Sequence, residues 1–478
     1  MTVARALHRR IADPRSLRAI GRRGAALGAL LALVLAGALV LRLEAAADRP
    51  GRSSADERAY VRLASDLRAG TGYGDAGLAH PLHWAPGAPG LFAFADALSG
   101  HAAGSRIDMG AGRRAQAVVG ALTVGAAFAL AALVAGALAG LVAAAAVAFY
   151  PPMVAATAHL TSEPLGALAL TAALAAVAWA WARAGPRAFV LAGAVAGAAC
   201  LVRADLLLAV LALVPAVGIL HARRAGWRAG TTVAAALLAG VLVLVAPWSI
   251  WASRAAGTFV PITDGASSTL LVATYLPGDG TIFGFKHAMA AETRRVHPEL
   301  RHQPVFRIPE KEIMDAVAAR HPHLSHDAAI TAELHRNLRM YLLGRPVAFA
   351  GMTARKAWRM WGFPFRGTFH RDSAATVWIH RALVALALLG LLAGVFVARS
   401  AALGLVLVAL STNVAVNLAF VSEARHAFRL MPALLAAGAA GGALVVAARR
   451  RQPAGRANEY DARISASTTA SSVSSRGA

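Results

Sequence analysis

Charge and cysteine are both scarce in this chain of 478 residues. Only 15% of the residues are charged, whereas a soluble globular domain carries about 25%, so the composition argues against a water-soluble globule. The single cysteine, Cys200, excludes an intrachain disulfide and a cysteine-based metal site. Lysine is nearly absent, with three residues against 45 arginines, and the arginines are scattered between apolar runs. That scatter does not form a basic domain of the kind that binds nucleic acid.

Apolar residues in long runs dominate instead. Hydrophobic residues make up 58% of the chain, and the mean hydropathy is +0.55. A helix needs about 20 predominantly apolar residues to cross a bilayer, and ten stretches meet or nearly meet this length. They lie at 24–42, 115–136, 139–159, 163–183, 187–202, 204–220, 229–251, 377–398, 402–421 and 430–447. The sequence therefore predicts an all-α polytopic membrane protein with about ten transmembrane helices.

Arginine clusters predict how these helices cross the membrane. Residues 1–23 hold seven arginines. If every cluster is cytoplasmic, as the positive-inside rule predicts, an even number of spans separates each pair of clusters. The apolar run 187–220, which Arg203 and Asp205 interrupt, must then cross twice, although one long span is the alternative. Both termini would be cytoplasmic in a multi-pass protein of the cell membrane. The other clusters are Arg183/Arg187, Arg223/Arg224/Arg228 and Arg449/Arg450/Arg451.

This topology divides the chain into five parts. Two extracytoplasmic segments are long while the cytoplasmic connections are short, so we expect the function on the extracytoplasmic face. The first span is expected to be a retained signal anchor. The parts are a cytoplasmic N-terminal segment (1–23), an N-terminal transmembrane module (24–251) that contains the first outer loop (43–113), an extracytoplasmic region with amphipathic helices (252–376), C-terminal transmembrane helices (377–447) and a disordered cytoplasmic tail (448–478).

The first outer loop begins with an acidic pair, Asp56 and Glu57, at the start of a predicted amphipathic helix. A preceding serine can cap this helix and acids in its first turn favour the helix dipole, so capping is the simplest explanation of the pair. A Pro-rich stretch follows from His80 and predicts the start of an interfacial helix. His80 and His83 within it are only weak candidates for metal ligands.

Further charges occur at the outer ends of the predicted spans. Glu163 follows Thr161 and Ser162 at a helix start, where capping alone also explains an acid. Arg203 and Asp205 interrupt an apolar run, and a charge there is costly unless it is paired or hydrated. One short outer turn carries Glu423, Arg425, His426 and Arg429.

The long segment 252–376 contains three closely spaced histidines, His321, His323 and His326. Their spacing allows a shared metal ion, but a solvated loop is the preferred explanation because a proline interrupts the stretch. Residues from about Asp327 to Leu343 repeat apolar side chains every four positions, which predicts an amphipathic helix.

Six motifs together resemble the GT-C superfamily of membrane glycosyltransferases, especially the dolichyl-phosphate-mannose protein mannosyltransferase and lipid A aminoarabinose transferase group. The resemblance covers residues 24–447. It implies a mannosyltransferase-like enzyme that takes a sugar from a polyprenyl-phosphate donor on the extracytoplasmic face, without a nucleotide. The acceptor is a protein, a glycan or a lipid. The motifs are DERAY (56–60), the stretch 73–89 ending in APGAP, TSEPL (161–165), LVRAD (201–205), PWSIW with GTFVPI (247–262) and the arginine-bearing turn before the last span.

The same resemblance assigns roles to residues. Asp56 matches the family's catalytic acid and is the expected general base of an inverting transfer, with Glu57 orienting base or acceptor. Guanidinium groups suit the phosphate that leaves, since they carry a permanent charge and donate two parallel hydrogen bonds. We expect no metal ion and no cofactor. The candidate substrate-binding residues are Arg58, Tyr60, His83, Glu163, Arg203, Arg425 and Arg429.

Two departures from the family argue against aminoarabinose transfer itself. Residues 84–86 occupy the region where those relatives have a lysine, and residues 249–251 replace an Arg-Asn pair. The competing function is a polytopic transporter or lipid flippase for a lipid-linked or anionic substrate. Transporters bind near the midplane, often between two related halves, whereas the charges here are predicted at one face.

Overall fold

The computed structural model describes residues 14–48, 53–74, 80–104, 106–365 and 372–451, and the side chains of residues 24–450 within these ranges. All secondary structure in these ranges is helical, which confirms the predicted all-α membrane fold. Residues 1–13 of the predicted cytoplasmic segment and residues 452–478 of the predicted disordered tail lie outside the described residues. The last helix continues to Arg451, so the prediction of disorder is wrong for residues 448–451.

Eight helices of the described chain are long and apolar enough to cross a membrane. A ninth span forms if α6 (Ala137–Ala148) and α7 (Pro151–Ala155), which are bent by 60° at their junction, count as one. The tenth expected span is α9 (Pro186–Val202), an apolar helix of only 17 residues. The eight are α2 (Pro14–Ala47), α5 (Met109–Ala135), α8 (Glu163–Arg183), α10 (Leu206–Ala225), α11 (Trp227–Ala256), α17 (Ala374–Phe396), α18 (Ala401–Ala419) and α19 (Ala424–Arg451).

Two prolines cause the bend between α6 and α7. Pro151 and Pro152 lack the backbone N–H groups that would bond the carbonyls of Val147 and Ala148 four residues earlier. Arg42 of α2, which is completely buried, bonds both carbonyls instead. Its Nη2 donates to the Val147 oxygen and its Nη1 to the Ala148 oxygen, each at 3.1 Å. The first span is thereby fixed to the bend.

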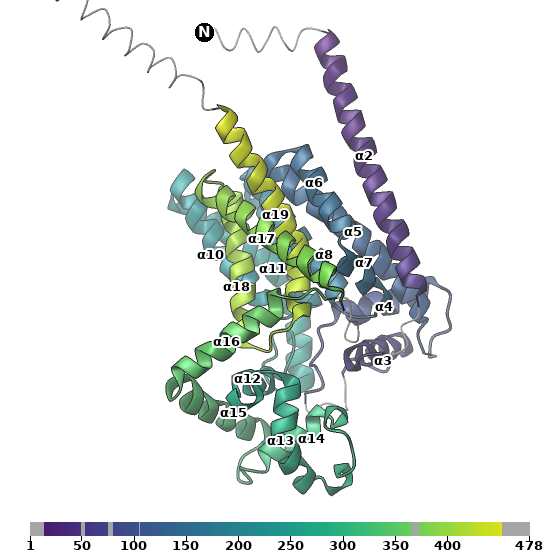
Figure 1. Ribbon diagram of the computed structural model, residues 1–478, viewed down its shortest axis with the longest axis vertical. Coiled ribbons are helices and arrows are strands. Elements are labelled where there is room, and N and C mark those ends of the chain that lie inside the picture. Colours follow the sequence, from purple (N-terminus) through teal and green to yellow (C-terminus); the bar gives the residue numbers. More distant parts are fainter. Residues whose placement is uncertain (1–13, 49–52, 75–79, 105, 366–371, 452–478) are drawn as a thin grey trace, which may run out of the picture.

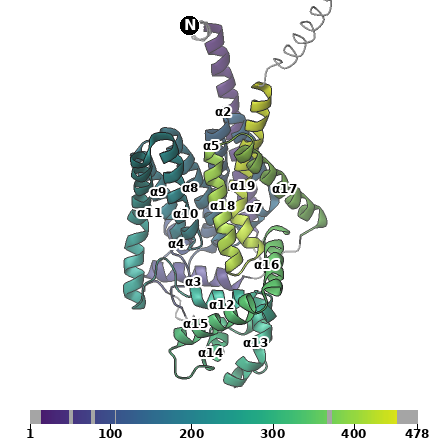
Figure 2. The ribbon, with the colours of Figure 1, turned by 90° about the vertical axis from the view of Figure 1, so that its left-hand side faces the viewer.

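The apolar run 187–220 forms two helices, α9 and α10, as the arginine clusters predicted. The chain leaves α9 at Arg203 in an extended conformation. Short α9 packs against α11 backbone to backbone (Figure 2), because glycines face each other across the contact. A Cβ atom on Gly240 would lie 2.0 Å from the carbonyl oxygen of Val190, and one on Gly193 would lie 2.0 Å from that of Leu237. Small residues of this kind permit close helix contacts in lipid.

The helices outside the bundle gather at one of its ends, which we call the loop end. The described chain begins with α2 and finishes with α19 at the opposite end (Figures 1 and 2). At the loop end, α3 (Ala55–Ala69) and α4 (Gly87–Leu98) lie across the ends of the spans. Ser54 caps α3, since its Oγ accepts a hydrogen bond from the Glu57 N–H at 3.1 Å. The predicted serine cap is therefore present, with both acids in the first turn of α3.

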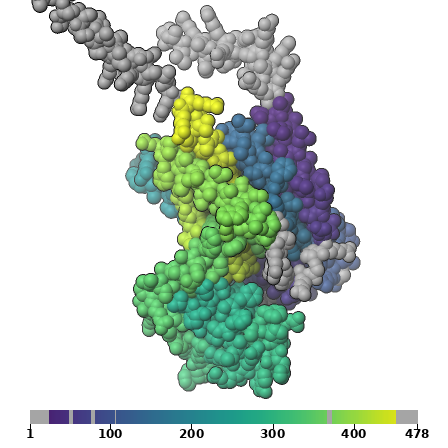
Figure 3. All heavy atoms as spheres, in the orientation of Figure 1, coloured from purple at the N-terminus to yellow at the C-terminus, as the bar shows by residue number. Residues whose placement is uncertain are grey.

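Beyond the loop end, four helices form a rounded lobe that we call the cap (Figure 3). Leu271, Phe285, Ile313 and Ile330 are among the buried side chains of its own small core. The predicted amphipathic helix 327–343 is present as α15 followed by a π-helix (Leu338–Leu343), and α16 (Pro346–Trp361) leads back to the bundle. The cap helices are α12 (Ala266–Thr274), α13 (Ile282–Val296), α14 (Glu310–Ala318) and α15 (His326–Asn337).

Candidate active site

Asp56 and Arg425 meet at the loop end of the bundle. Asp56 lies in the first turn of α3 and Arg425 in the first turn of α19, and Arg425 Nη1 donates to Asp56 Oδ2. The Nε of the same guanidinium lies 3.0 Å from Glu423 Oε2. The side chains of Asp56 and Arg425 remain 29% and 24% exposed, so the pair is partly accessible to solvent.

A second ion pair lies one helical turn further into the bundle. Arg429 Nη1 and Nη2 donate to the two carboxylate oxygens of Asp205 at 2.8 and 2.6 Å. The Nε of Arg203 is 3.1 Å from Asp205 Oδ1. Burial alone would raise the pKa of Asp205, but Arg429 and Arg203 outweigh it and hold that pKa well below its usual range. Asp205 is therefore a permanent anion between two permanent cations.

The Arg203 side chain also contacts residues at the start of α8. Its Nη1 donates to Ser162 Oγ at 2.8 Å and lies 3.8 Å from Glu163 Oε1. Tyr60 of α3 donates to the same Ser162 oxygen at 2.9 Å, and burial raises the pKa of Tyr60, so the phenol stays a neutral donor. Gly166 gives the arginines room, because a Cβ there would lie 3.1 Å from Arg203 Cγ. We call the following seven side chains the charge cluster: Asp56, Glu163, Arg203, Asp205, Glu423, Arg425 and Arg429.

Comparisons with known proteins bear on this arrangement. Residues 91–251 match the family model described as dolichyl-phosphate-mannose-protein mannosyltransferase. The archaeal oligosaccharyltransferase AglB from Archaeoglobus fulgidus, solved with an inhibitory peptide and a dolichol-phosphate, is similar at a TM-score of 0.54 and 15% identity over 93% of this chain and 52% of that chain. The fold of the chain is similar to that of this oligosaccharyltransferase. Its spans, short loop-end helices and cap together cover about half the length of that oligosaccharyltransferase.

Other solved structures agree less well with this chain. The apo oligosaccharyltransferase of Archaeoglobus fulgidus gives a TM-score of 0.51 at 14% identity, over 91% of this chain and 52% of that one. ArnT from Cupriavidus metallidurans bound to undecaprenyl phosphate gives a TM-score of 0.40 at 19% identity, over 86% of this chain and 77% of that one. No curated protein sequence matches.

Glu57 occupies a different environment from its neighbour Asp56. It is completely buried, and its Oε1 accepts from the Leu160 N–H at 3.0 Å while its Oε2 lies 3.8 Å from His159 Nδ1. Burial would raise the pKa of Glu57, but His159, the Leu160 N–H and Arg113 together lower it. Glu57 therefore fixes α3, the helix that carries Asp56, to the turn ahead of α8.

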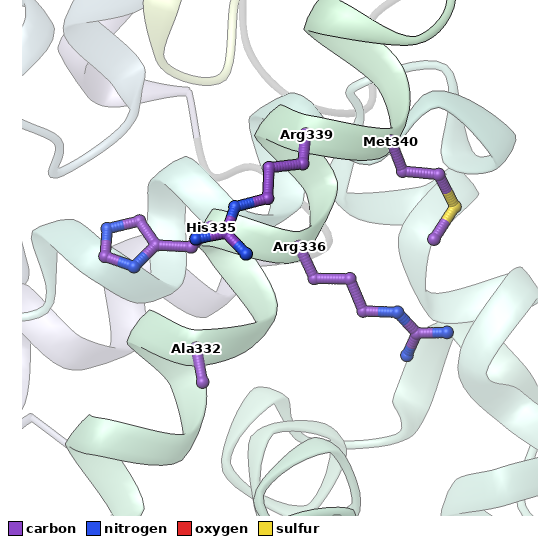
Figure 4. A pocket seen from close by; sticks show the side chains of 5 residues that line it. All are labelled: Ala332, His335, Arg336, Arg339 and Met340. Atoms are coloured by element: carbon purple, nitrogen blue, oxygen red, sulfur yellow. The ribbon is translucent and has the colours of Figure 1, made fainter.

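Arg58 is not brought into the charge cluster. It donates to the Ser53 carbonyl at 2.7 Å and lines an open hollow of about 410 Å³ on another face of α3, together with Arg62 and Arg106. A second hollow of about 520 Å³ lies on the cap (Figure 4). Neither hollow is lined by Asp56 or Arg425, so the charges, rather than these two hollows, define the candidate site.

Two of the histidines considered as candidate ligands, His83 and His321, have aromatic or ionic contacts instead. His83 packs edge-on against Trp84 at 4.8 Å between ring centroids, and Trp84 packs in the same way against Tyr60 at 5.0 Å. In the cap, His321 Nε2 lies 2.9 Å from a Glu333 oxygen. The described part of the chain has no group of three or more side chains placed to hold a metal ion.

Two asparagines at the site were missed by the sequence reasoning. Asn413 Nδ2 donates to the Asp205 carbonyl at 3.0 Å, and Asn417 Nδ2 donates to Asn413 Oδ1 at 3.0 Å. Arg429 Nη2 also donates to Asn417 Oδ1 at 3.3 Å. Their signal in the sequence was two amides four residues apart within an apolar span, where buried polar groups tend to be functional.

Proposed function

We propose that the protein is an integral membrane glycosyltransferase that transfers a sugar from a polyprenyl-phosphate donor to an acceptor hydroxyl. The observation that carries this proposal is the partly exposed pair of Asp56 and Arg425, with Arg203 nearby. A carboxylate that accepts a proton and guanidinium groups that bind phosphate are the two elements this transfer needs. The family match over residues 91–251 and the dolichol-phosphate in complex with the similar AglB support it.

The reaction assigns a role to each charge. The acceptor hydroxyl loses its proton to the Asp56 carboxylate while its oxygen attacks the anomeric carbon of the sugar. The bond from that carbon to the phosphate oxygen breaks, and the electron pair stays on the lipid phosphate. Arg425 and Arg203 stabilise the added negative charge. Attack from the face opposite the phosphate inverts the anomeric configuration. Glu163 and Tyr60 would contact the sugar or hold Arg203 in place.

The orientation in the membrane is also part of the proposal. Arg183, Arg223, Arg224 and Arg449 lie at ends of spans that point away from the loop end. By the positive-inside rule, the end of the bundle that carries these arginines is cytoplasmic. The charge cluster, at the loop end, would then face the extracytoplasmic side. The charges lie at the ends of the helices rather than at mid-span, which favours a transferase over a transporter.

Transfer of labelled sugar from a panel of polyprenyl-phosphate sugars, with purified protein in nanodiscs, tests this function. Asp56→Asn should lower the transfer rate by about 10²–10⁴-fold, the contribution expected of a general base, with an unchanged melting temperature. Asp66→Asn removes the same charge from the same helix and is the matched control. Transfer that survives in Asp56→Asn rejects Asp56 as the base, and absence of transfer by the wild type from every donor rejects the function.

A further inference from the structure

Two arginines on α19, four residues apart, are held in different ways. Arg429 is 1% exposed and binds Asp205 through both carboxylate oxygens. Arg425 is partly exposed and contacts a single oxygen of Asp56. A bidentate buried pair is fixed in place, whereas a partly exposed contact through one oxygen is worth little and exchanges readily. Arg425 is therefore the guanidinium that can change partner.

The balance of charge in the cluster supports such an exchange. Its seven side chains include four carboxylates and three guanidinium groups. Each guanidinium already lies against a carboxylate, so a phosphate that binds one of them competes with that carboxylate. A phosphate that takes over Arg425 from Asp56 replaces one anion by another at the guanidinium. Glu423, 3.0 Å from Arg425 Nε, can hold the arginine in position during the exchange.

The same contact limits Asp56 as a base. While Arg425 donates to Oδ2, that carboxylate oxygen is already occupied by a donor. Glu57, the next residue, does not substitute for it, because its carboxylate is buried against Leu160 and His159. The base is thus restrained in the donor-free protein, and the group that restrains it is the one expected to bind the donor.

We infer that the donor phosphate and Asp56 compete for Arg425, so that binding of the donor releases the base and donor binding precedes productive acceptor binding. This inference rests on the proposed function and adds an order of binding to it. The phosphate accepts the hydrogen bonds that Arg425 gave to Asp56, and the freed carboxylate turns to the acceptor hydroxyl. No bond is made or broken in this step.

Binding of undecaprenyl phosphate, without a sugar, tests the competition directly. The dissociation constant is measured in nanodiscs for the wild type, Asp56→Asn, Arg425→Gln and the matched control Asp66→Asn. Removing the competitor in Asp56→Asn should tighten binding by about two- to fivefold, as expected for a partly exposed ion pair. Arg425→Gln should weaken binding by at least a similar factor, and Asp66→Asn should bind as the wild type does. Undecaprenol, which lacks the phosphate, should not respond to any of these substitutions.

The outcomes separate this inference from the function on which it rests. Unchanged or weaker binding by Asp56→Asn, with weaker binding by Arg425→Gln, overturns the competition and leaves the phosphate site intact. Equal binding by Arg425→Gln and the wild type removes the proposed donor site itself. Asp56→Ala carries the same prediction as Asp56→Asn and replaces it if the asparagine variant does not fold.

Discussion

Arg429 of the last span and Asp205 of the turn between α9 and α10 form a bidentate ion pair across 224 residues of sequence. Arg203 and Asn413 bond the same aspartate from two other directions. The pair therefore joins the N-terminal and C-terminal parts of the bundle at the loop end. Arg425, one turn away on α19, takes its place beside Asp56 because Arg429 anchors the helix.

Breaking this buried ion pair should lower the stability of the protein. Asp205→Asn leaves the buried Arg429 charge without its main partner, and the free energy of unfolding should fall by about 3–5 kcal/mol. Thermal unfolding in detergent measures this change. Asp315→Asn, which breaks the more exposed pair with Lys311, is the control and should change the stability by less than about 1 kcal/mol. Equal effects of the two substitutions would contradict the anchoring role of Asp205.

Glu57→Ala should lower stability and transfer together, unlike Asp56→Asn, which should lower transfer alone. The alanine removes the acceptor for the Leu160 N–H and leaves that buried donor unpaired, at a cost of about 1–3 kcal/mol. Glu57→Gln retains an oxygen for this bond and should recover part of the loss. Melting temperature and transfer rate are measured on the same preparations. A stable Glu57→Ala variant without activity would instead indicate direct contact with the substrate.

Gly240→Ala should separate α9 from α11. Its methyl group would lie 2.0 Å from the Val190 carbonyl oxygen, which belongs to the backbone and cannot turn aside. We expect a loss of at least about 1–3 kcal/mol, as for overpacking of a tightly packed contact. Gly404→Ala, in the span α18, is the matched control because no atom lies within 4 Å of its added methyl group. Similar melting temperatures for both variants would show that α9 tolerates displacement.

Lys356 of α16 should make stability depend on pH. Its Nζ is buried and donates to the Ala273 carbonyl at 3.4 Å, and burial lowers the pKa of Lys356 from 10.5 to about 8. Between these values the unfolded chain binds more protons than the folded protein, so stability rises with pH there, and the full penalty is present below about pH 8. Lys356→Met should therefore stabilise the protein by up to about 3 kcal/mol at pH 7.

The same substitution should give little gain near pH 10.5, where the buried amine is neutral in the wild type and the unfolded lysine is losing its proton. Thermal unfolding at pH 7 and near pH 10 distinguishes the two conditions. Lys311→Met replaces a more exposed lysine and serves as the control. An equal gain at both pH values would assign the effect of Lys356→Met to packing rather than to the charge.

Much of the fold could be predicted from apolar length and arginine position. Each of the ten predicted stretches contains a helix, and the division of 187–220 followed from charge alone. Two features needed the structure. The stretch 139–159 is bent because Pro151 and Pro152 interrupt it, and α9 contacts the backbone of α11 through facing glycines.

The candidate site was predictable in part. Asp56, Tyr60, Glu163, Arg203 and Arg425 do come together, in accordance with the motifs that contain them. The distinct roles of the two α19 arginines were not predictable, because they depend on which carboxylate lies opposite each one, and those carboxylates are hundreds of residues away.

Arg58 shows the limit of reasoning from motifs. It stands two positions after Asp56 on the same helix, and residues so spaced point to different sides. The helical period alone therefore argued against placing both side chains in one site. The motif suggested otherwise, and the structure follows the helical period.

The contact of Arg42 with the broken helix has a consequence for how the chain is assembled. The carbonyls of Val147 and Ala148 would face hydrocarbon without a donor if α2 were missing. The segment that contains them is synthesised after α2, so its partner is already in the membrane when it arrives. A truncated protein without the first helix would leave both carbonyls without this donor among apolar helices, where an unpaired carbonyl is costly.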